Sequence, residues 1–228
     1  MTAPTASGVP WKRWLALLAL VVVLTVAFVN LAQWQFRRLD ERRGTNATVV
    51  AHEDAPVLPY EKVFDHPVVD ADAWQRVTVT GTFDAAHQLI VRYRNNGDSA
   101  GYEVVVPLRA TDGRVVLIDR GFVTRPAGQD FPTSVAAPPT GQVTVVGHVR
   151  RNEQGPDIAT TPVSGSLRLI NSDAIGAASG LSLVNGYIGA LEMSPAQQGF
   201  TPIATPPLDE GPHLSYAFQW IPFAVIAL

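Results

Sequence analysis

Cysteine is absent from this sequence of 228 residues, and lysine occurs only twice beside 15 arginines. The chain therefore has no disulfide, no thiolate metal site and no cysteine nucleophile. The preference for arginine over lysine is typical of a high-GC bacterial genome. Between Gly44 and Pro212 the chain has 18 acidic and 11 basic residues, a formal charge of −7 that repels phosphate. We therefore expect no nucleic-acid partner.

Charged residues are also missing from Leu15–Ala32, an almost entirely apolar run near the N-terminus. A helix of this length spans about 27 Å, close to the hydrocarbon core of a bilayer, which is about 30 Å thick. Trp14 and Trp34 lie at its two ends, as interfacial aromatic residues do. The run does not end in a small-residue cleavage site. We therefore expect a retained transmembrane helix at residues 14–36, preceded by a tail at residues 1–13.

A second apolar run, Tyr216–Leu228, closes the sequence without a polar flank. Its length of about 20 Å is too short to cross a bilayer alone. One interpretation is a buried core segment, because apolar runs of about 10 to 14 residues commonly have that place. The other is the start of a second transmembrane helix at residues 212–228, with Pro212 in the first turn and a continuation beyond Leu228. We favour the second interpretation, because the run has no stop signal.

Residues 37–211 have the pattern of a β-rich domain. Apolar or small side chains alternate with polar ones from Trp74 to Phe83, as in a strand with one buried face. Thr111-Asp112-Gly113 predicts a hairpin turn, and Ser172–Ser179, followed by Gly180, predicts one short helix. No strand–helix alternation indicates a parallel sheet, so we expect an antiparallel sandwich or a partly open barrel. Further strands are expected at residues 87–93, 102–108, 114–120, 142–150 and 183–193, and surface loops at residues 125–141 and 152–165.

One pentapeptide, Gly97-Asp98-Ser99-Ala100-Gly101, fits the G-x-S-x-G pattern of serine hydrolases. A nucleophile elbow needs a strand before it and a helix after it, whereas a strand is expected to follow here. We therefore expect a hairpin loop. A membrane-anchored serine hydrolase that uses Ser99 stays as a minor alternative.

The five histidines show no metal-ligand spacing, but one of them heads an aromatic helix face. On a helix His213 shares a face with Tyr216 and Trp220. A neutral imidazole at a membrane interface can ligate haem iron, with aromatic side chains beside the porphyrin. The other interpretation is an interfacial histidine beside an ordinary aromatic belt, and the residues alone favour it. The remaining histidines, which we expect at the surface, are His52, His66, His87 and His148.

Several short segments resemble, in order and spacing, the Surfeit locus protein 1 family of cytochrome c oxidase assembly factors. The resemblance extends over nearly the whole chain. Asp119 departs from the family pattern, which often has asparagine before Arg-Gly. The segments are Leu31-Ala32-Gln33-Trp34-Gln35-Phe36-Arg37-Arg38, Gly81-Thr82-Phe83-Asp84, Gly101-Tyr102-Glu103-Val104-Val105-Val106-Pro107-Leu108, Arg120-Gly121-Phe122-Val123 and His213-Leu214-Ser215-Tyr216.

The resemblance implies a non-enzymatic factor that helps to mature the core subunit of a haem-copper oxidase, together with other subunits of the respiratory complex. It implies a plasma-membrane protein with two membrane helices, a cytoplasmic tail at residues 1–13 and an extracytoplasmic domain at residues 37–211. The positive-inside rule opposes this orientation, because two basic residues precede the first helix and four follow it. We follow the family topology, since long domains cross the membrane largely regardless of charge.

The resemblance also implies site residues. Haem a would be bound by His213 as iron ligand, with Tyr216 and Trp220 beside it. A membrane or partner interface would contain Trp34, Gln35, Arg38, Arg120 and Gly121. For Arg120 and Gly121 an ordinary turn glycine beside a surface or paired arginine is an equal alternative. As a whole the chain could instead be a stably bound accessory subunit of the oxidase, or a generic extracytoplasmic binding domain.

Overall fold

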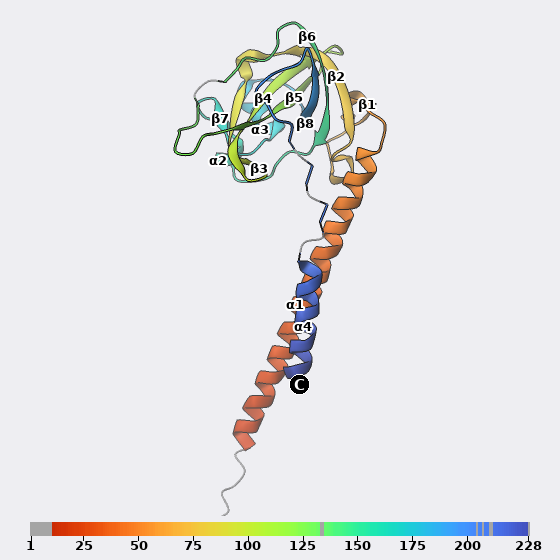
Figure 1. Ribbon diagram of the computed structural model, residues 1–228, viewed down its shortest axis with the longest axis vertical. Helices are drawn as coiled ribbons and strands as arrows, with labels where there is room; N and C mark the ends of the chain where they lie inside the picture. Colours follow the sequence, from red (N-terminus) through yellow and green to blue (C-terminus); the bar gives the residue numbers. More distant parts are fainter. Residues whose placement is uncertain (1–10, 133–134, 204, 207, 210–211, 228) are drawn as a thin grey trace, which may run out of the picture. The chain divides into compact units, whose positions relative to one another are not determined.

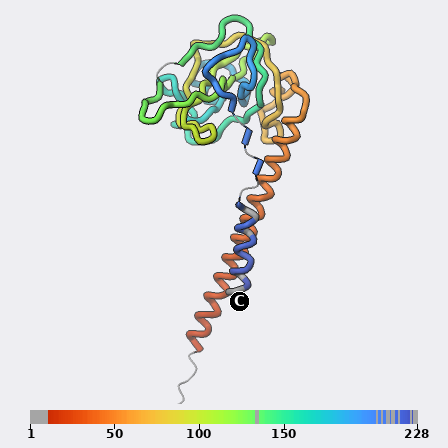
Figure 2. Tube along the Cα trace, in the orientation of Figure 1, coloured from red at the N-terminus to blue at the C-terminus, as the bar shows by residue number. Residues whose placement is uncertain are grey.

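A computed structural model describes residues 11–132, 135–203, 205–206, 208–209 and 212–227 of the chain. The chain forms two compact units. The first consists of Met1–Ala47 and Pro207–Leu228, and the second of Thr48–Pro206. Both terminal segments thus belong to one helical unit, while the strands belong to the other (Figures 1 and 2).

The longest element is α1 (Trp11–Glu53), a helix of 43 residues whose last residues, from Thr48 on, belong to the second unit. At 1.5 Å per residue it is about 64 Å long. Within the described residues it is the one helix long and apolar enough to cross a membrane. It continues beyond the predicted helix at residues 14–36, because no proline interrupts it and Gly44 costs only about 1 kcal/mol in a helix.

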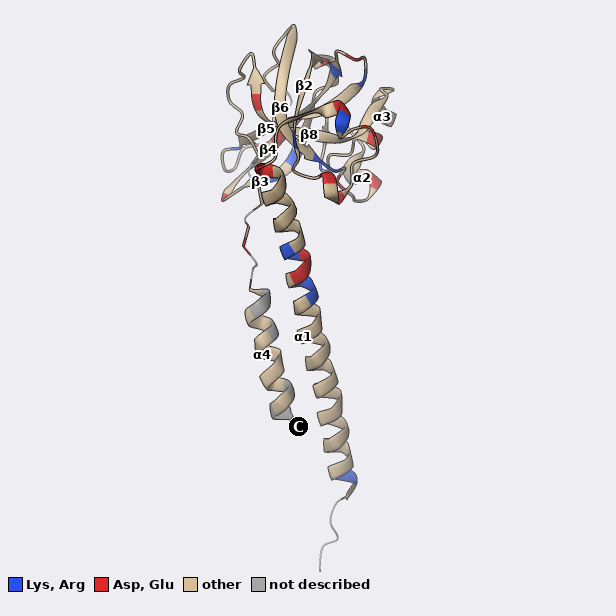
Figure 3. Ribbon diagram, turned by 90° about the vertical axis from the view of Figure 1, so that its right-hand side faces the viewer, with Lys and Arg blue, Asp and Glu red and all other residues tan. Residues whose placement is uncertain are grey.

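Most of the apolar part of α1 is exposed. The side chains of Leu18 and Val23 are 59% and 63% exposed. So long an apolar surface is unfavourable in water but favourable in the hydrocarbon core of a bilayer. The charged residues gather in a band on the next part of the helix (Figure 3), namely Arg37, Arg38, Asp40, Glu41, Arg42 and Arg43.

The second helix of this unit is α4 (His213–Ala227), which lies beside α1 in both views (Figures 1 and 3). Its 15 residues span about 22 Å and include Pro222. Phe218 and Val225 are 59% and 66% exposed, so this helix also presents apolar side chains outward. A second transmembrane span at residues 212–228 stays a prediction.

The second unit is built around a β-barrel. Five strands lie side by side in the order β2, β6, β8, β5 and β4, and β2 then pairs with β4 to close the ring. The closing contact is short and extends from Gly81↔Ala110 to Phe83↔Leu108. Glycine at position 81 permits the two backbones to approach each other. A Cβ atom at Gly81 would lie 2.3 Å from the carbonyl oxygen of Arg109. The bounds are β2 (Arg76–Phe83), β4 (Ser99–Ala110), β5 (Val115–Thr124), β6 (Gln142–Arg150) and β8 (Leu183–Ser194).

Smaller elements surround the ring. β3 (Leu89–Asn96) pairs with β4, and the two-residue strands β1 (Leu58–Pro59) and β7 (Ser166–Leu167) pair with β2 and β3. A four-residue helix, α2 (Asp157–Thr160), lies inside the segment predicted as a loop at residues 152–165. Three single-turn helices are η1 (Tyr60–Lys62), η2 (Asp70–Asp72) and η3 (Ala85–His87).

The expectation of an antiparallel sheet was wrong for part of the domain. β5 and β8 are parallel neighbours, with Ile118 opposite Ile188, and the pairs β1–β2 and β3–β7 are parallel as well. The chain between β5 and β8 contains β6, α2, β7 and α3, so this pair joins distant segments. Parallel strands need such long crossovers, and no local alternation of side chains reveals them.

The short helix α3 (Ser172–Ser179) forms where the sequence predicted it. The Asn171 side chain accepts a hydrogen bond from the Ala174 amide at 3.0 Å, and Gly180 ends the helix in the left-handed region at φ 71°. These are the ordinary cap residues of a helix. Ile175 packs into a second core beside Tyr187, on the outer face of the sheet, while the main core fills the barrel.

Candidate functional site

The aromatic face predicted on α4 is present in the helical unit. Tyr216 is 44% exposed and Trp220 is half-buried. The helix begins at His213, but the side chain of that residue lies outside the described residues. The helix spacing therefore brings Tyr216 and Trp220 to the same side, and the predicted haem ligand stays a prediction.

Two phenylalanines of α1 contact aromatic rings of α4, and sequence reasoning missed them. The rings of Phe28 and Trp220 are stacked, with 5.7 Å between centroids and 20° between planes. Phe223 lies 6.0 Å from Phe28, and Phe36 meets Phe218 edge-on at 6.4 Å. The signal that could have found them is a pair of aromatic residues a little more than two turns apart in an aliphatic run. These contacts place aromatic rings of both helices together.

The residues at the exit of the first apolar run divide by burial. Gln35 is 8% exposed, whereas Trp34 is 45% exposed. The Arg38 guanidinium lies 5.9 Å from the centre of the Trp34 ring and 2.8 Å from the Glu41 carboxylate. Trp34 and Arg38 thus form an exposed pair of an aromatic and a basic side chain, which is common at a lipid interface.

The Arg120 side chain points into the barrel domain and not to the surface. The period of two on β5 puts it on the face of Val116 and Ile118, which pack into the barrel core. Its side chain is 2% exposed. Burial lowers its pKa to about 10, which still leaves it charged at neutral pH. Its acceptors are the Gln197 and Gln88 amide oxygens, at 3.0 and 2.7 Å, and the carbonyls of Ala136 and Ala137, at 2.6 and 3.3 Å.

Gly121 permits the next segment of the chain to approach. Its φ is +120°, a value that side chains rarely adopt, and a Cβ atom there would lie 2.6 Å from the carbonyl oxygen of Thr201. Phe122 and Thr201 exchange two backbone hydrogen bonds at 2.8 Å. We call residues 195–202 the strap, because they lie across β5 after β8 has ended. Arg120 and Gly121 together hold it, since Gln197 donates from its amide to the Arg120 carbonyl at 2.7 Å.

A buried cluster of ionisable side chains, which no local pattern of residues indicated, lies on the opposite face of β5. It contains Arg94, Glu103, Asp119, Glu153 and Tyr187. Arg94 lies 2.8 Å from Glu103 and 2.7 Å from Glu153. Burial and the negative charge of Glu103 raise the pKa of Asp119 well above its usual value, and burial also raises that of Tyr187. The cluster is largely buried and joins residues of the four strands β3, β4, β5 and β8.

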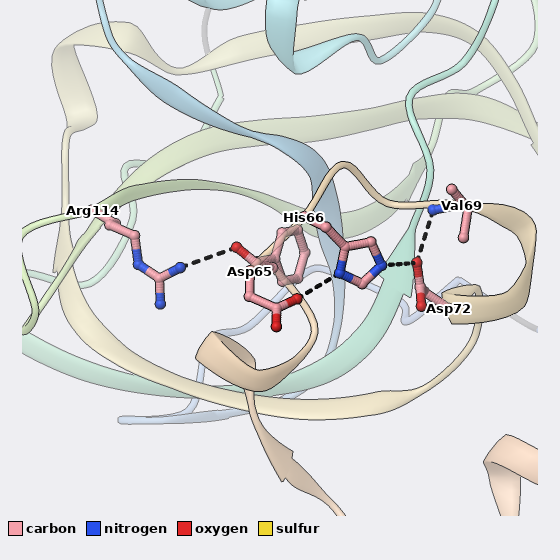
Figure 4. Close-up of polar contacts among 6 residues, drawn as sticks. Asp65, His66, Val69, Asp72 and Arg114 are labelled. Carbon is pink, nitrogen blue, oxygen red and sulfur yellow. Dashed lines mark hydrogen bonds and ion pairs between the residues drawn. The ribbon is translucent and has the colours of Figure 1, made fainter.

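The Asp65-His66-Asp72 network, shown in Figure 4, is the main exposed polar cluster around an imidazole. The Nδ1 atom of His66 lies 2.5 Å from Asp65 and its Nε2 atom 3.1 Å from Asp72. The hydrogen bond to Asp65, with the charges of both carboxylates, raises the pKa of His66. Asp72 also accepts from the Val69 amide at 2.8 Å, so the network ties the loop around η2. Both ring nitrogens are engaged, which leaves no free imidazole nitrogen for a substrate.

One histidine was placed wrongly from the sequence. His148 is 6% exposed, with its ring 5.5 Å from that of Trp74. Burial, together with Arg150 and Arg76, lowers its pKa to about 4. Its position in β6 gives the reason, since Val149 and Gly147 beside it are buried as well. Across the part of the chain that the structure describes, no three His, Asp or Glu side chains gather to hold a metal ion.

Ser99 does not lie in a nucleophile elbow. It opens β4 and pairs with Asn96 across the hairpin turn at Gly97 and Asp98. The pentapeptide therefore joins two strands, β3 and β4. A nucleophile elbow requires a helix after the serine, and here a strand follows. The predicted hairpin is confirmed, and the geometry gives no support to a hydrolase.

Comparison with known proteins yields consistent matches. The family model described as the SURF1 family matches residues 22–225. Uncharacterized SURF1-like proteins of Mycobacterium bovis and of two strains of Mycobacterium tuberculosis are each 31% identical over 221 residues. Each alignment covers 94% of this chain and 80% of the relative. These relatives come from high-GC bacteria, as the arginine preference predicted.

Proposed function

The chain belongs to the SURF1 family, a family of cytochrome oxidase assembly proteins, and from this premise we propose that it is an assembly factor for a haem-copper terminal oxidase. Its N-terminal apolar helix is a candidate membrane anchor. The protein would act without catalysing a reaction, by handling a cofactor and a partner subunit. Its place of action would be the plasma membrane, where the oxidase core is made.

The proposed topology has two membrane helices and an extracytoplasmic barrel. The exposed apolar side chains of α1 and α4 support it, because both helices would otherwise present these side chains to water. The ring contacts between Phe28 and Trp220 and between Phe36 and Phe218 support a common depth for the two helices. At about 22 Å, α4 is shorter than the hydrocarbon core of a bilayer, which is about 30 Å thick.

Haem a is the proposed cofactor, and α4 is the proposed place of contact. His213 would supply a neutral imidazole nitrogen to the iron, and Tyr216 and Trp220 would line the porphyrin. The observation that carries this proposal is the stacked pair of Phe28 and Trp220. The pair forms an aromatic surface about two helical turns from the first residue of α4. A bound haem supplies the redox centre of the oxidase, while this chain would bind and orient it.

Trp34 and Arg38 are the proposed contacts with the oxidase core subunit or with lipid head groups. Both are exposed and lie next to each other on α1. Gln35 is buried beside them and would fix the helix rather than touch a partner. Arg120 and Gly121 would act on a partner subunit through the strap that they hold, since the Arg120 side chain is only 2% exposed.

A deletion strain tests the proposed function. Cells without the gene should lose most of their haem a-containing oxidase activity, while other terminal oxidases continue. A plasmid copy should restore it, and a His213→Ala copy should restore it only in part. Normal oxidase activity and haem a content in the deletion strain would contradict the assembly role. An accessory subunit, the alternative, would remain in the purified mature oxidase in equal amount with the core subunit, whereas an assembly factor would be lost.

A further inference from the structure

A cavity of about 330 Å³ opens at the end of the barrel, between β8 and the strap. This volume lies at the lower end of the range of natural ligand pockets, roughly 300 to 1,000 Å³. All of its lining residues belong to the second unit. They are Arg120, the β8 residues Ala190, Leu191, Glu192 and Met193, and the strap residues Ala196, Gln197, Phe200 and Pro202.

The cavity contains a buried cation without a counter-ion. The four acceptors of the Arg120 guanidinium are all neutral amide or carbonyl oxygens. Among the described residues, no carboxylate lies within ion-pair distance of it, and burial is the one influence on its pKa. A charged group in a dry interior is costly unless an opposite charge accompanies it. Arg94, by contrast, is matched by two carboxylates in the same domain.

The guanidinium also has a donor to spare. It carries five N–H groups, and one of the two on Nη2 is left after the four hydrogen bonds. The ring of Phe200 lies 4.2 Å from the Arg120 Cζ atom. Met193 and Pro202 extend this apolar wall. The lining of the cavity therefore places a positive charge with one unbonded N–H group directly beside an apolar surface.

We propose that this cavity binds a small amphipathic monocarboxylate, whose carboxylate receives the free N–H group of Arg120 and whose apolar part lies against Phe200 and Met193. Glu192 limits the negative charge that a ligand of this cavity can carry. It lines the same cavity and is exposed, so it repels a dianion such as phosphate more strongly than a single carboxylate. This site is independent of the proposed haem contact on α4, and either can be absent without the other.

Binding of benzoate to the full-length protein in detergent micelles tests the site, with neutral benzamide as matched probe. Isothermal titration should show benzoate binding and at least about ten-fold weaker binding of benzamide, as expected for loss of a charge-assisted hydrogen bond. The Arg120→Gln variant should bind benzoate at least about ten-fold more weakly, while Arg109→Gln, at an exposed arginine of β4, should bind as the wild type does. Glu192→Gln should bind benzoate more tightly, because a like charge is removed.

A second variant separates loss of binding from loss of folding, because it leaves the buried Arg120 in place. Ala196 is exposed on the strap, so Ala196→Phe should fold normally and fill the cavity with its ring. It should abolish benzoate binding with Arg120 intact, and its thermal unfolding should match that of the wild type. Equal affinity for benzoate and benzamide, no benzoate binding by the wild type, or undiminished binding by Ala196→Phe would each overturn the proposal.

Discussion

Arg94 and Glu103 form an ion pair across the strands β3 and β4, with 2.8 Å between Nε and Oε2. The two side chains are only 16% and 10% exposed. Burial alone would lower the pKa of Arg94, but Glu103 and Glu153 raise it above its usual value. For Glu103 the raising effect of burial exceeds the lowering effect of Arg94. One arginine therefore holds two carboxylates inside the domain, which makes it the most sensitive member of the cluster.

Replacement of this arginine should destabilise the domain strongly. Arg94→Gln leaves Glu103 and Glu153 without their cation, and loss of one partner of a buried pair costs about 3–5 kcal/mol. The midpoint of urea unfolding gives the measurement. The control is Arg151→Gln, whose partner Asp70 lies at 2.7 Å but is 83% exposed, and which should cost less than about 1 kcal/mol. Equal losses in the two variants would contradict the importance of burial.

Asp119→Asn should stabilise the protein at neutral pH. Burial and Glu103 raise the pKa of Asp119 in the folded state, so the protonated acid is favoured there. Its contribution to stability is complete below the unfolded pKa of about 4 and is lost as the pH rises towards the folded pKa. Asparagine avoids this loss, keeps the acceptor for the Gly121 amide at 2.9 Å, and is the residue that the family often has here.

The measurement for Asp119→Asn is the thermal midpoint as a function of pH. The variant should unfold at a higher temperature than the wild type at about pH 7, and the difference should shrink towards pH 4. A variant less stable than the wild type at neutral pH would show that the charged carboxylate is needed.

Gly121→Ala should release the strap. The added Cβ atom would lie 2.6 Å from the Thr201 carbonyl at a φ of +120°, so both strain and a clash with backbone act against it. Gly97→Ala is the control, because its φ is +60° and nothing lies within 4 Å of the new Cβ atom. The control should cost about 1–2 kcal/mol and Gly121→Ala clearly more, as measured by urea unfolding. Faster cleavage of the strap by protease should accompany Gly121→Ala only.

His66 should make stability depend on pH near neutrality. The carboxylates of Asp65 and Asp72 raise its pKa in the folded state, so its contribution is complete below about pH 6.5 and is lost as the pH rises through the folded pKa. The difference in unfolding midpoint between wild type and His66→Gln should therefore be larger at about pH 5.5 than at about pH 8.5. An unchanged difference would mean that the imidazole is neutral in this network.

Local patterns predicted the elements well, because their causes are local. The alternation along β2, the Asn171 and Gly180 caps of α3 and the hairpin at Ser99 each depend on a few neighbouring residues. The parallel pair β5–β8 could not be predicted, since it joins segments that a long crossover separates. α1 was predicted too short for a related reason, because a polar sequence after Phe36 can continue a helix or end it.

The candidate sites were predictable in composition but not in arrangement. The common side of Tyr216 and Trp220 follows from helix spacing, whereas Phe28, which stacks on Trp220, lies almost 200 residues away and only the fold brings it near. Arg120 was a plausible surface residue until the barrel placed it on the face of the core. His148 was misplaced because a histidine in a strand can face either side, and register alone decides which.

The visible spectrum of the full-length protein, purified from cells that make haem a, tests the central claim most directly. The wild type should carry haem a in a fixed ratio to protein, and a His213→Ala variant prepared in the same way should have lost it. A Tyr216→Phe variant should retain most of it, because the aromatic ring is kept. Haem-free wild type, or equal haem in wild type and His213→Ala, would contradict the account of α4 as the place of haem contact.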